Sequence, residues 1–182
     1  ESARGRCLTA GAGADAGSVR LLVVPDIPPT DSGSLPYEDI VPDDEVLAAI
    51  AAYLEPRRCI GARVSVEPPT YQGITVVARV RARQLVAADT LSRACQEALY
   101  RYLNPVTGGP DGDGWPFGRT VQRGEIYSVL QRVPGTDFVE EIKLFPADPA
   151  TGEREPATER VELNDDSLVF SYEHQIRVEE AS

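Results

Sequence analysis

The fold is set mainly by residues 74–103, ITVVARVRARQLVAADTLSRACQEALYRYL. In the first part of this stretch every second residue is apolar, and Arg79, Arg81 and Arg83 occupy the positions between them. Such alternation is typical of a strand with one face in the core and the other in water. In the second part, apolar residues recur every three or four positions as far as Leu103. This spacing predicts an amphipathic helix.

Shorter elements flank this strand and helix. A β-branched run at residues 19–24, an alternating run at 64–67 and a doubly apolar run at 138–145 predict three further strands. Helical spacing predicts helices at residues 43–55 and, more briefly, at 126–133. The order is strand, helix, two strands, helix, short helix, strand. We therefore predict an α+β fold with a ferredoxin-like βαββαβ core and one inserted short helix.

The two ends of the chain differ from this core. Residues 1–18 are rich in glycine and alanine, which predicts an arm or linker before the α+β domain at residues 19–147. Residues 148–182 predict a C-terminal β-hairpin extension, because Val161 and Leu163 lead through a turn at residues 164–167 into a strongly alternating run. The residues expected on one side of that run are Leu168, Phe170, Tyr172, His174, Ile176 and Val178.

Charge and cysteine content narrow the possible partners. The net charge is -11, which repels nucleic-acid phosphates and anionic membrane surfaces. Cys7, Cys59 and Cys95 are widely spaced, and His174 is the only histidine available to complete a metal site. We expect free thiols in a reducing compartment, no metal, no cofactor, no nucleic acid and no membrane among the partners.

The sequence contains no recognisable motif of catalytic or metal-binding residues. His174 lies in phase with apolar neighbours, which favours a packed histidine over an acid or base. The segment DGDG at residues 111–114 resembles a calcium loop, but Trp115 and Gln122 stand where oxygen ligands are needed. The acidic pairs of the chain are best explained as solvated charge. We therefore expect a protein that is not an enzyme.

The loop at residues 103–119, LNPVTGGPDGDGWPFGR, is too particular to be a generic connection. Together with RRCIGARV at 57–64, PTY at 69–71 and the segment from EIY at 125–127 to Gly135, it resembles the baseplate J-like wedge family of contractile phage tails and contractile injection systems. The resemblance runs from about residue 18 to 145. It does not extend to residues 146–182.

The resemblance implies a structural role in baseplate assembly. It implies a wedge subunit in a hetero-oligomeric particle, in contact with other baseplate subunits and with proteins near the sheath or tube. Such a protein would be cytoplasmic during assembly and then part of a phage-tail-like particle. The resemblance places the matching region near the C-terminus of a longer protein, which the absence of methionine also favours. It implies no catalytic residues.

Six residues are candidates for interface contacts or for anchoring the loop: Trp115, Phe117, Arg119, Tyr71, Arg79 and Arg81. Trp115 and Phe117 are large apolar side chains in a loop rich in glycine and proline. They either pin an Ω-type loop onto its own domain or contact a partner directly. The arginines either bind an acidic partner or pair with carboxylates of this acidic chain.

A second function remains open at this point. A ferredoxin-like ligand-binding or regulatory module would use a pocket between sheet and helices. The two functions predict different surface features. An assembly component should show exposed apolar or arginine-lined patches, whereas a ligand-binding module should show an enclosed cavity with convergent polar groups.

Overall fold

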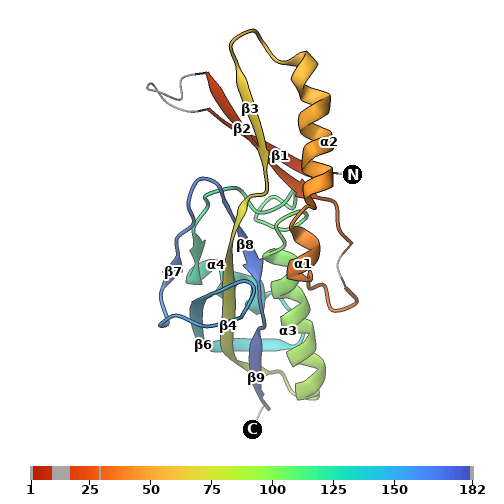
Figure 1. Cartoon of the computed structure of the whole chain (residues 1–182). Coiled ribbons are helices and arrows are strands. Elements are labelled where there is room, and N and C mark those ends of the chain that lie inside the picture. Colours follow the sequence, from red (N-terminus) through yellow and green to blue (C-terminus); the bar gives the residue numbers. More distant parts are fainter. Residues whose placement is uncertain (1, 10–16, 29, 181–182) are drawn as a thin grey trace. The chain divides into compact units, whose positions relative to one another are not determined.

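The computed structural model describes residues 2–9, 17–28 and 30–180 (Figure 1). The chain divides into two compact units. Unit 1 comprises residues 1–28 and 36–70, and unit 2 comprises residues 29–35 and 71–182. Among the described residues, no helix is both long and apolar enough to cross a membrane.

Unit 1 is a three-stranded sheet with a helical crossover. The strand order is β1-β2-β3, in which β2 is antiparallel to β1 and parallel to β3. The crossover between β2 and β3 holds two α-helices and a short 3-10 helix. The bounds are β1 (Ser2–Thr9), β2 (Ser18–Pro25), α1 (Tyr37–Ile40), α2 (Asp44–Leu54), η1 (Glu55–Arg57) and β3 (Arg63–Glu67).

The helix predicted at residues 43–55 is confirmed as α2. Asp44 and Glu45 lie in its first turn, where negative charge is stabilised by the helix dipole. Pro56 lies in the following 3-10 turn and ends the α-helical hydrogen bonding. The strands at 19–24 and 64–67 are also confirmed, as β2 and β3. Leu22 and Val24 of β2 have no exposed surface.

Two parts of unit 1 differ from the prediction. The predicted arm at residues 1–18 contains β1, in which half-buried Arg4, Arg6 and Leu8 alternate with exposed residues. The high glycine and alanine content of residues 1–18 favours a linker, so this alternation alone does not predict a strand. Residues 10–16 of the predicted arm lie outside the described residues. The prolines in the stretch at 26–41 predict a loop, but this stretch holds the single turn α1.

Unit 2 contains a four-stranded sheet and two helices. Its sheet has the order β6-β4-β8, and β9 also pairs with β4. A second, two-stranded sheet joins β5 and β7. The bounds are β4 (Thr70–Ala82), α3 (Ala88–Tyr102), β5 (Val121–Gln122), α4 (Arg123–Gln131), β6 (Thr136–Ala147), β7 (Arg160–Val161), β8 (Ser167–Ser171) and β9 (Gln175–Glu179).

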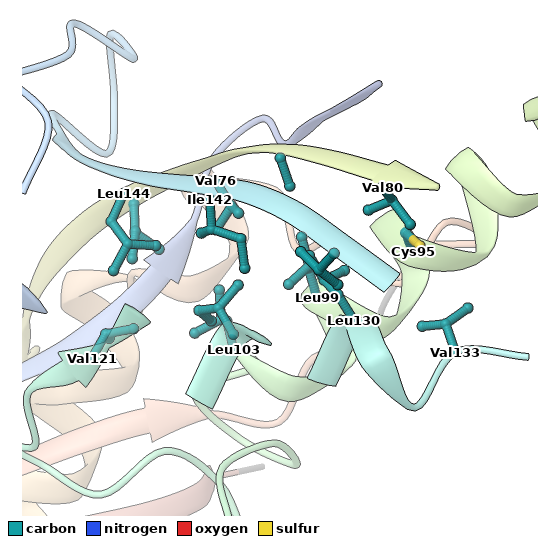
Figure 2. Packing of buried hydrophobic residues seen from close by; sticks show 14 of the residues in the cluster. Val76, Val80, Cys95, Leu99, Leu103, Val121, Leu130, Val133, Ile142 and Leu144 are labelled. Carbon is teal, nitrogen blue, oxygen red and sulfur yellow. The ribbon is translucent and has the colours of Figure 1, made fainter. Parts of the chain in front are cut away.

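The core of unit 2 lies between the sheet and the helices α3 and α4 (Figure 2). The apolar face predicted for residues 74–103 is confirmed: Leu91, Cys95 and Leu99 of α3 are buried. They belong to one cluster with residues of β4 and β6, including Val76 and Ile142, and Figure 2 shows Cys95 and Leu99 on the side of α3 that faces these strands. A fully buried leucine contributes roughly 1.5–3 kcal/mol relative to an exposed one. This layer is therefore the main source of stability in unit 2.

The mixed α+β class is confirmed, but the ferredoxin-like topology is not. A ferredoxin-like core would place residues 19–24, 64–67, 74–82 and 138–145 in one sheet. The first two runs instead form β2 and β3 of one sheet, and the last two pair with each other in another. Pro68 and Pro69 separate β3 from β4, and proline has no N–H to continue a ladder.

The predicted C-terminal hairpin is wrong. The hairpin would pair Val161 and Leu163 with the alternating run after the turn at residues 164–167. Instead, β7 pairs with β5, and β8 and β9, which make up the alternating run, both lie beside β4; β9 runs parallel to it. They occupy successive parts of β4, since the Tyr172 N–H donates to the Ile74 carbonyl and Ile176 lies opposite Ala78. The chain therefore continues forward after β8, and residues 172–174 interrupt the strand without reversing it.

The interruption also changes which side chains share a face. Val169 of β8 belongs to the same core cluster as Ile176 and Val178 of β9. In one uninterrupted strand, Val169 would face the opposite side, because its position differs from those of Ile176 and Val178 by an odd number of residues. Side chains alternate along a strand, so one irregular step transfers the apolar set to the other face. The six residues expected on one side of a single strand therefore do not share one face.

Candidate functional site

The loop at residues 103–119 closes on its own first residues. The Asn104 side-chain Oδ1 accepts hydrogen bonds from the N–H groups of Val106, at 2.7 Å, and Thr107, at 2.9 Å. Its backbone carbonyl accepts from the N–H groups of Gly108, at 3.0 Å, and Trp115, at 3.3 Å. Asn104 is 5% exposed. One buried asparagine thus holds both the start of the loop and its return.

Two glycines allow the loop to fold this tightly. A Cβ on Gly108 would lie 2.5 Å from the carbonyl oxygens of both Arg101 and Tyr102. Gly109 has a φ of 81° and donates its N–H to the Tyr102 carbonyl at 2.7 Å. These carbonyls belong to the last turn of α3, where intrahelical donors run out. The glycine backbone therefore caps α3 and could not do so with a side chain present.

Trp115 fixes the far end of the loop. Its side chain has no exposed surface, and its Nε1 donates to the Arg119 carbonyl at 2.9 Å. The ring of Tyr102 meets the indole edge-on, with the ring centroids 5.6 Å apart. The Arg119 guanidinium lies over the indole, 4.9 Å from its centroid. Trp115 is therefore an internal anchor of the loop, because no part of the indole is available to a partner.

Arg119 joins the loop to the start of α4. Its guanidinium pairs with the carboxylate of Glu125, with one contact at 3.2 Å and a second, shorter one. Glu125 also accepts from the Gln122 N–H at 3.2 Å, which completes a capping box at the helix N-terminus. The same carboxylate therefore fixes the end of the loop and the first turn of α4.

The loop also contacts the segment before β8. The Gly118 N–H donates to the Ser167 carbonyl at 3.0 Å. Gly118 has a φ of 70°, and a Cβ there would lie 3.1 Å from the Asp165 Cα. Phe117 is half-buried beside it, and Tyr71 lies buried at the start of β4. Of the three candidate residues in the loop, Trp115 and Arg119 contact each other.

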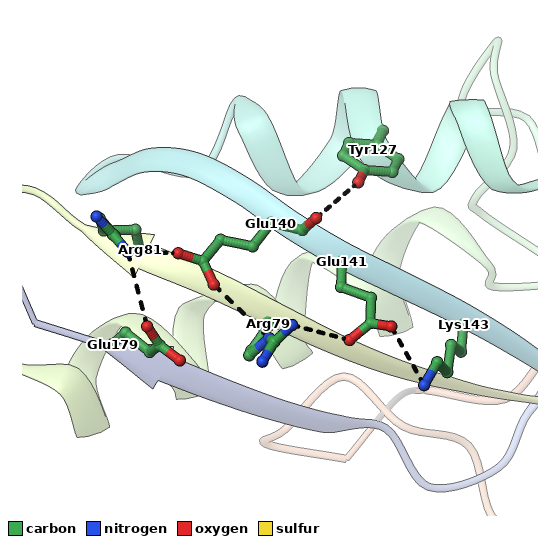
Figure 3. Close-up of polar contacts among 7 residues, drawn as sticks. All are labelled: Arg79, Arg81, Tyr127, Glu140, Glu141, Lys143 and Glu179. Carbon is green, nitrogen blue, oxygen red and sulfur yellow. Dashed lines mark hydrogen bonds and ion pairs between the residues drawn. The ribbon is translucent and has the colours of Figure 1, made fainter.

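Arg79 and Arg81 form a second cluster, on the outer face of the unit 2 sheet (Figure 3). Arg79 pairs with Glu141 at 3.1 Å and with Glu140 at 3.6 Å. Arg81 pairs with Glu140 at 2.7 Å and with Glu179 at 3.7 Å. Arg79 thus pairs with two carboxylates of β6, and Arg81 joins a carboxylate of β6 to one of β9. This is the intrachain pairing that the acidic composition suggested, so an acidic partner would have to displace these carboxylates.

A groove of about 620 Å³ runs beside this cluster. It is lined by charged residues of α4, β6 and the segment before β7, including Arg123, Glu140 and Glu159. Arg123 and Glu159 pair with each other at 2.6 Å, and their side chains are 42% and 72% exposed. The groove is therefore open and charged. It does not have the enclosed character expected of a small-molecule pocket.

His174 occupies the interruption between β8 and β9. It is 1% exposed, and its Nδ1 accepts the Val76 N–H at 3.1 Å. Its carbonyl accepts from the Gln96 side chain at 2.9 Å, and its ring lies 4.8 Å from that of Tyr100. The imidazole thus accepts the hydrogen bond of the Val76 N–H in β4, at the point where the break between β8 and β9 leaves no strand carbonyl among the described residues to accept it. The packed histidine predicted from the sequence is confirmed, in a role that alternation alone could not show.

Burial lowers the pKa of His174 to about 3 from an ordinary value of 6.5. Below pH 6.5, His174 takes up a proton in the unfolded chain but stays neutral in the native chain. The free energy of unfolding is therefore lower below pH 6.5 than above it, and it falls further as the pH approaches 3. At pH 4.5 this loss is about 2–3 kcal/mol. In urea unfolding, the free energy of unfolding of wild type should fall by this amount more than that of His174→Asn when the pH is lowered from 7 to 4.5. The asparagine amide does not titrate and its oxygen can still accept the Val76 N–H. Equal pH dependence of the two proteins would contradict this assignment.

The cysteines and the DGDG segment offer no assembled metal site. Among the described residues, no group of three or more His, Cys, Asp or Glu side chains is placed to hold a metal ion. Cys95 is buried, and burial raises the pKa of its thiol to about 11, which leaves it protonated at neutral pH. Asp111 and Asp113 are exposed at the tip of the loop.

Three residues that matter to this arrangement were not among the candidates. Asn104 organises the loop, and the Asn-Pro pair after a helix is a signal for such a turn. Ser92 and Gln96 of α3 donate to the carbonyls of Ile176, in β9, and of His174, just before β9. Their partners are 84 and 78 residues away, so no local pattern could have identified them.

No protein-family model matches the chain, and no curated protein matches its sequence. Among solved structures, it is similar to a chain of the cryo-EM structure of the anti-feeding prophage (AFP) baseplate, 6-fold symmetrised. The sequence identity is 18% and the TM-score is 0.46. The similarity covers 85% of the present chain and 29% of that chain, so the present chain spans less than a third of its length.

Proposed function

We propose that the protein is a structural component of the baseplate of a contractile injection system or phage-like tail. Within the baseplate it acts as a wedge subunit of the J-like kind, through contacts with other subunits and with proteins near the sheath or tube. Its role is non-catalytic and requires no cofactor. The particle is hetero-oligomeric, and the protein enters it from the cytoplasm.

The observation that carries this proposal is the loop at residues 103–119. Its sequence resembles the J-like wedge signature, and its distinctive residues have definite physical tasks. Gly108 allows the turn over the end of α3, and Trp115 is the buried anchor. A loop fixed at both ends holds its exposed tip, Asp111 to Asp113, in one conformation. Fixed surface features favour assembly because little conformational entropy is lost on binding.

The surface of unit 2 also favours assembly over ligand binding. Its outer sheet face carries half-exposed Arg79 and Arg81 with their carboxylates, and the groove beside it is open. Arginine is enriched at protein interfaces, whereas small-molecule sites are enclosed and mostly apolar. The arginine-lined face is thus the feature expected of an assembly component.

Deleting the gene from its source organism tests this role. We expect electron microscopy to show no complete contractile particles, and we expect the full-length gene to restore them when it is returned on a plasmid. A strain without the gene that produced normal particles with intact baseplates would contradict the proposal.

A further inference from the structure

Leu85 lies in the connection between β4 and α3 (Figure 1) and combines two unfavourable features. Its φ is 67°, and it is the only non-glycine residue with a positive φ among the described residues. Its side chain is also fully exposed, at 106% of the reference area. The left-handed backbone conformation costs roughly 1–2 kcal/mol for a residue with a Cβ. Glycine or asparagine would fit this position better.

The neighbours of Leu85 hold the turn in place. On one side, the Arg83 N–H donates to the Gly135 carbonyl at 2.9 Å, and its Nε donates to the Thr136 carbonyl at 3.0 Å. On the other side, Val86 packs against the core of unit 2 and donates its N–H to the Arg83 carbonyl at 3.2 Å. Strain of this kind persists where the surrounding structure determines the backbone. Leu85 is therefore held rigidly outward.

Neither feature contributes to the stability of this unit. A fully exposed leucine buries no apolar area here, so it cannot offset the strain of its own backbone. Exposed apolar residues on fixed turns are suited to partner contacts, because a rigid side chain loses little entropy when it is buried. Strained residues also cluster at sites of function.

We infer that Leu85 is a docking residue that inserts into an apolar socket on a neighbouring protein subunit. This inference rests on the proposed function and adds one contact to it. Exposed Arg83, held beside Leu85 by its bond to Thr136, favours a socket with a carboxylate at its rim. The net charge of -11 argues against an anionic lipid surface as the occupant.

The test uses full-length variants returned to a strain that lacks the gene. We expect Leu85→Gly and Leu85→Asn to be present in purified particles at no more than about a tenth of the wild-type amount, because both remove the apolar side chain. Both residues tolerate a positive φ, so the Tm of each purified variant should equal that of wild type or exceed it by up to about 4 °C.

Ile60→Gly is the matched control, since Ile60 is equally exposed, at 105%, in unit 1. We expect it to enter particles at the wild-type level. Wild-type amounts of either Leu85 variant would overturn the inference, as would an equal loss in Ile60→Gly. A loss accompanied by a lowered Tm in both Leu85 variants would also overturn it, because Leu85 would then act through folding. Wild-type protein absent from particles would instead refute the proposed function.

Discussion

Replacing Trp115 with alanine is expected to lower the free energy of unfolding by about 3–5 kcal/mol. The indole has no exposed surface, so its removal leaves a cavity between the loop and the end of α3. The replacement also removes the hydrogen bond to the Arg119 carbonyl and the contact with the Arg119 guanidinium. Urea unfolding followed by far-ultraviolet circular dichroism measures this loss.

Asp165→Lys is the control for the Trp115 variant. Asp165 is exposed in the turn before β8, so reversing its charge should change the free energy of unfolding by no more than about 0.5 kcal/mol. In the full-length protein, Trp115→Ala should also reduce incorporation into particles more than Asp165→Lys does. If Trp115→Ala unfolds and assembles like wild type while Asp165→Lys fails, the turn before β8, and not the anchored loop, is the contact site.

A second large effect is expected from Gly108→Ala. The added Cβ would lie 2.5 Å from the carbonyl oxygens of Arg101 and Tyr102 and 2.7 Å from the Asn104 nitrogen. All three are backbone atoms, so the loop or the last turn of α3 must move. We expect a loss of about 3 kcal/mol in the free energy of unfolding, at the upper end of the usual cost of overpacking.

Gly124→Ala provides the matched comparison for Gly108→Ala. Gly124 lies in the first turn of α4, and a Cβ there would have nothing within 4 Å. Because alanine favours helix over glycine, this variant should be up to about 1 kcal/mol more stable than wild type. Chemical denaturation of the two variants side by side measures the difference. Similar stabilities for the two variants would show that the turn at Gly108 is not tightly packed.

Elements with strong local periodicity could be predicted from the sequence. The strand and helix within residues 74–103 are confirmed as β4 and α3, because each buries the apolar face that its spacing defines. The association of strands could not be predicted in the same way. Residues 19–24 pair with β1 and β3, and the place beside β4 is taken by β8 and β9 from the far end of the chain. Strand pairing depends on contacts between distant segments, which alternation does not encode.

The contacts of the candidate site could be predicted where the residues are close in sequence, and could not where they depend on distant strands. Trp115 and Arg119 lie close in sequence, so their association within the loop followed from the composition of that loop. The pairing of Arg81 with Glu140 and Glu179 required the register of three strands. His174 was expected to be packed, but its bond to the Val76 N–H depends on the break between β8 and β9. A regular alternating sequence gave no sign of that break.

The central claim, that this protein is a baseplate component, is tested most directly by locating it in a particle. The full-length protein would carry a small epitope tag and replace the native copy in its source organism. Sheathed particles would then be purified by sedimentation and examined by immunogold electron microscopy. We predict gold label at one end of each particle, where the baseplate lies. Label along the length of the sheath or tube, or particles without label, would contradict the proposal.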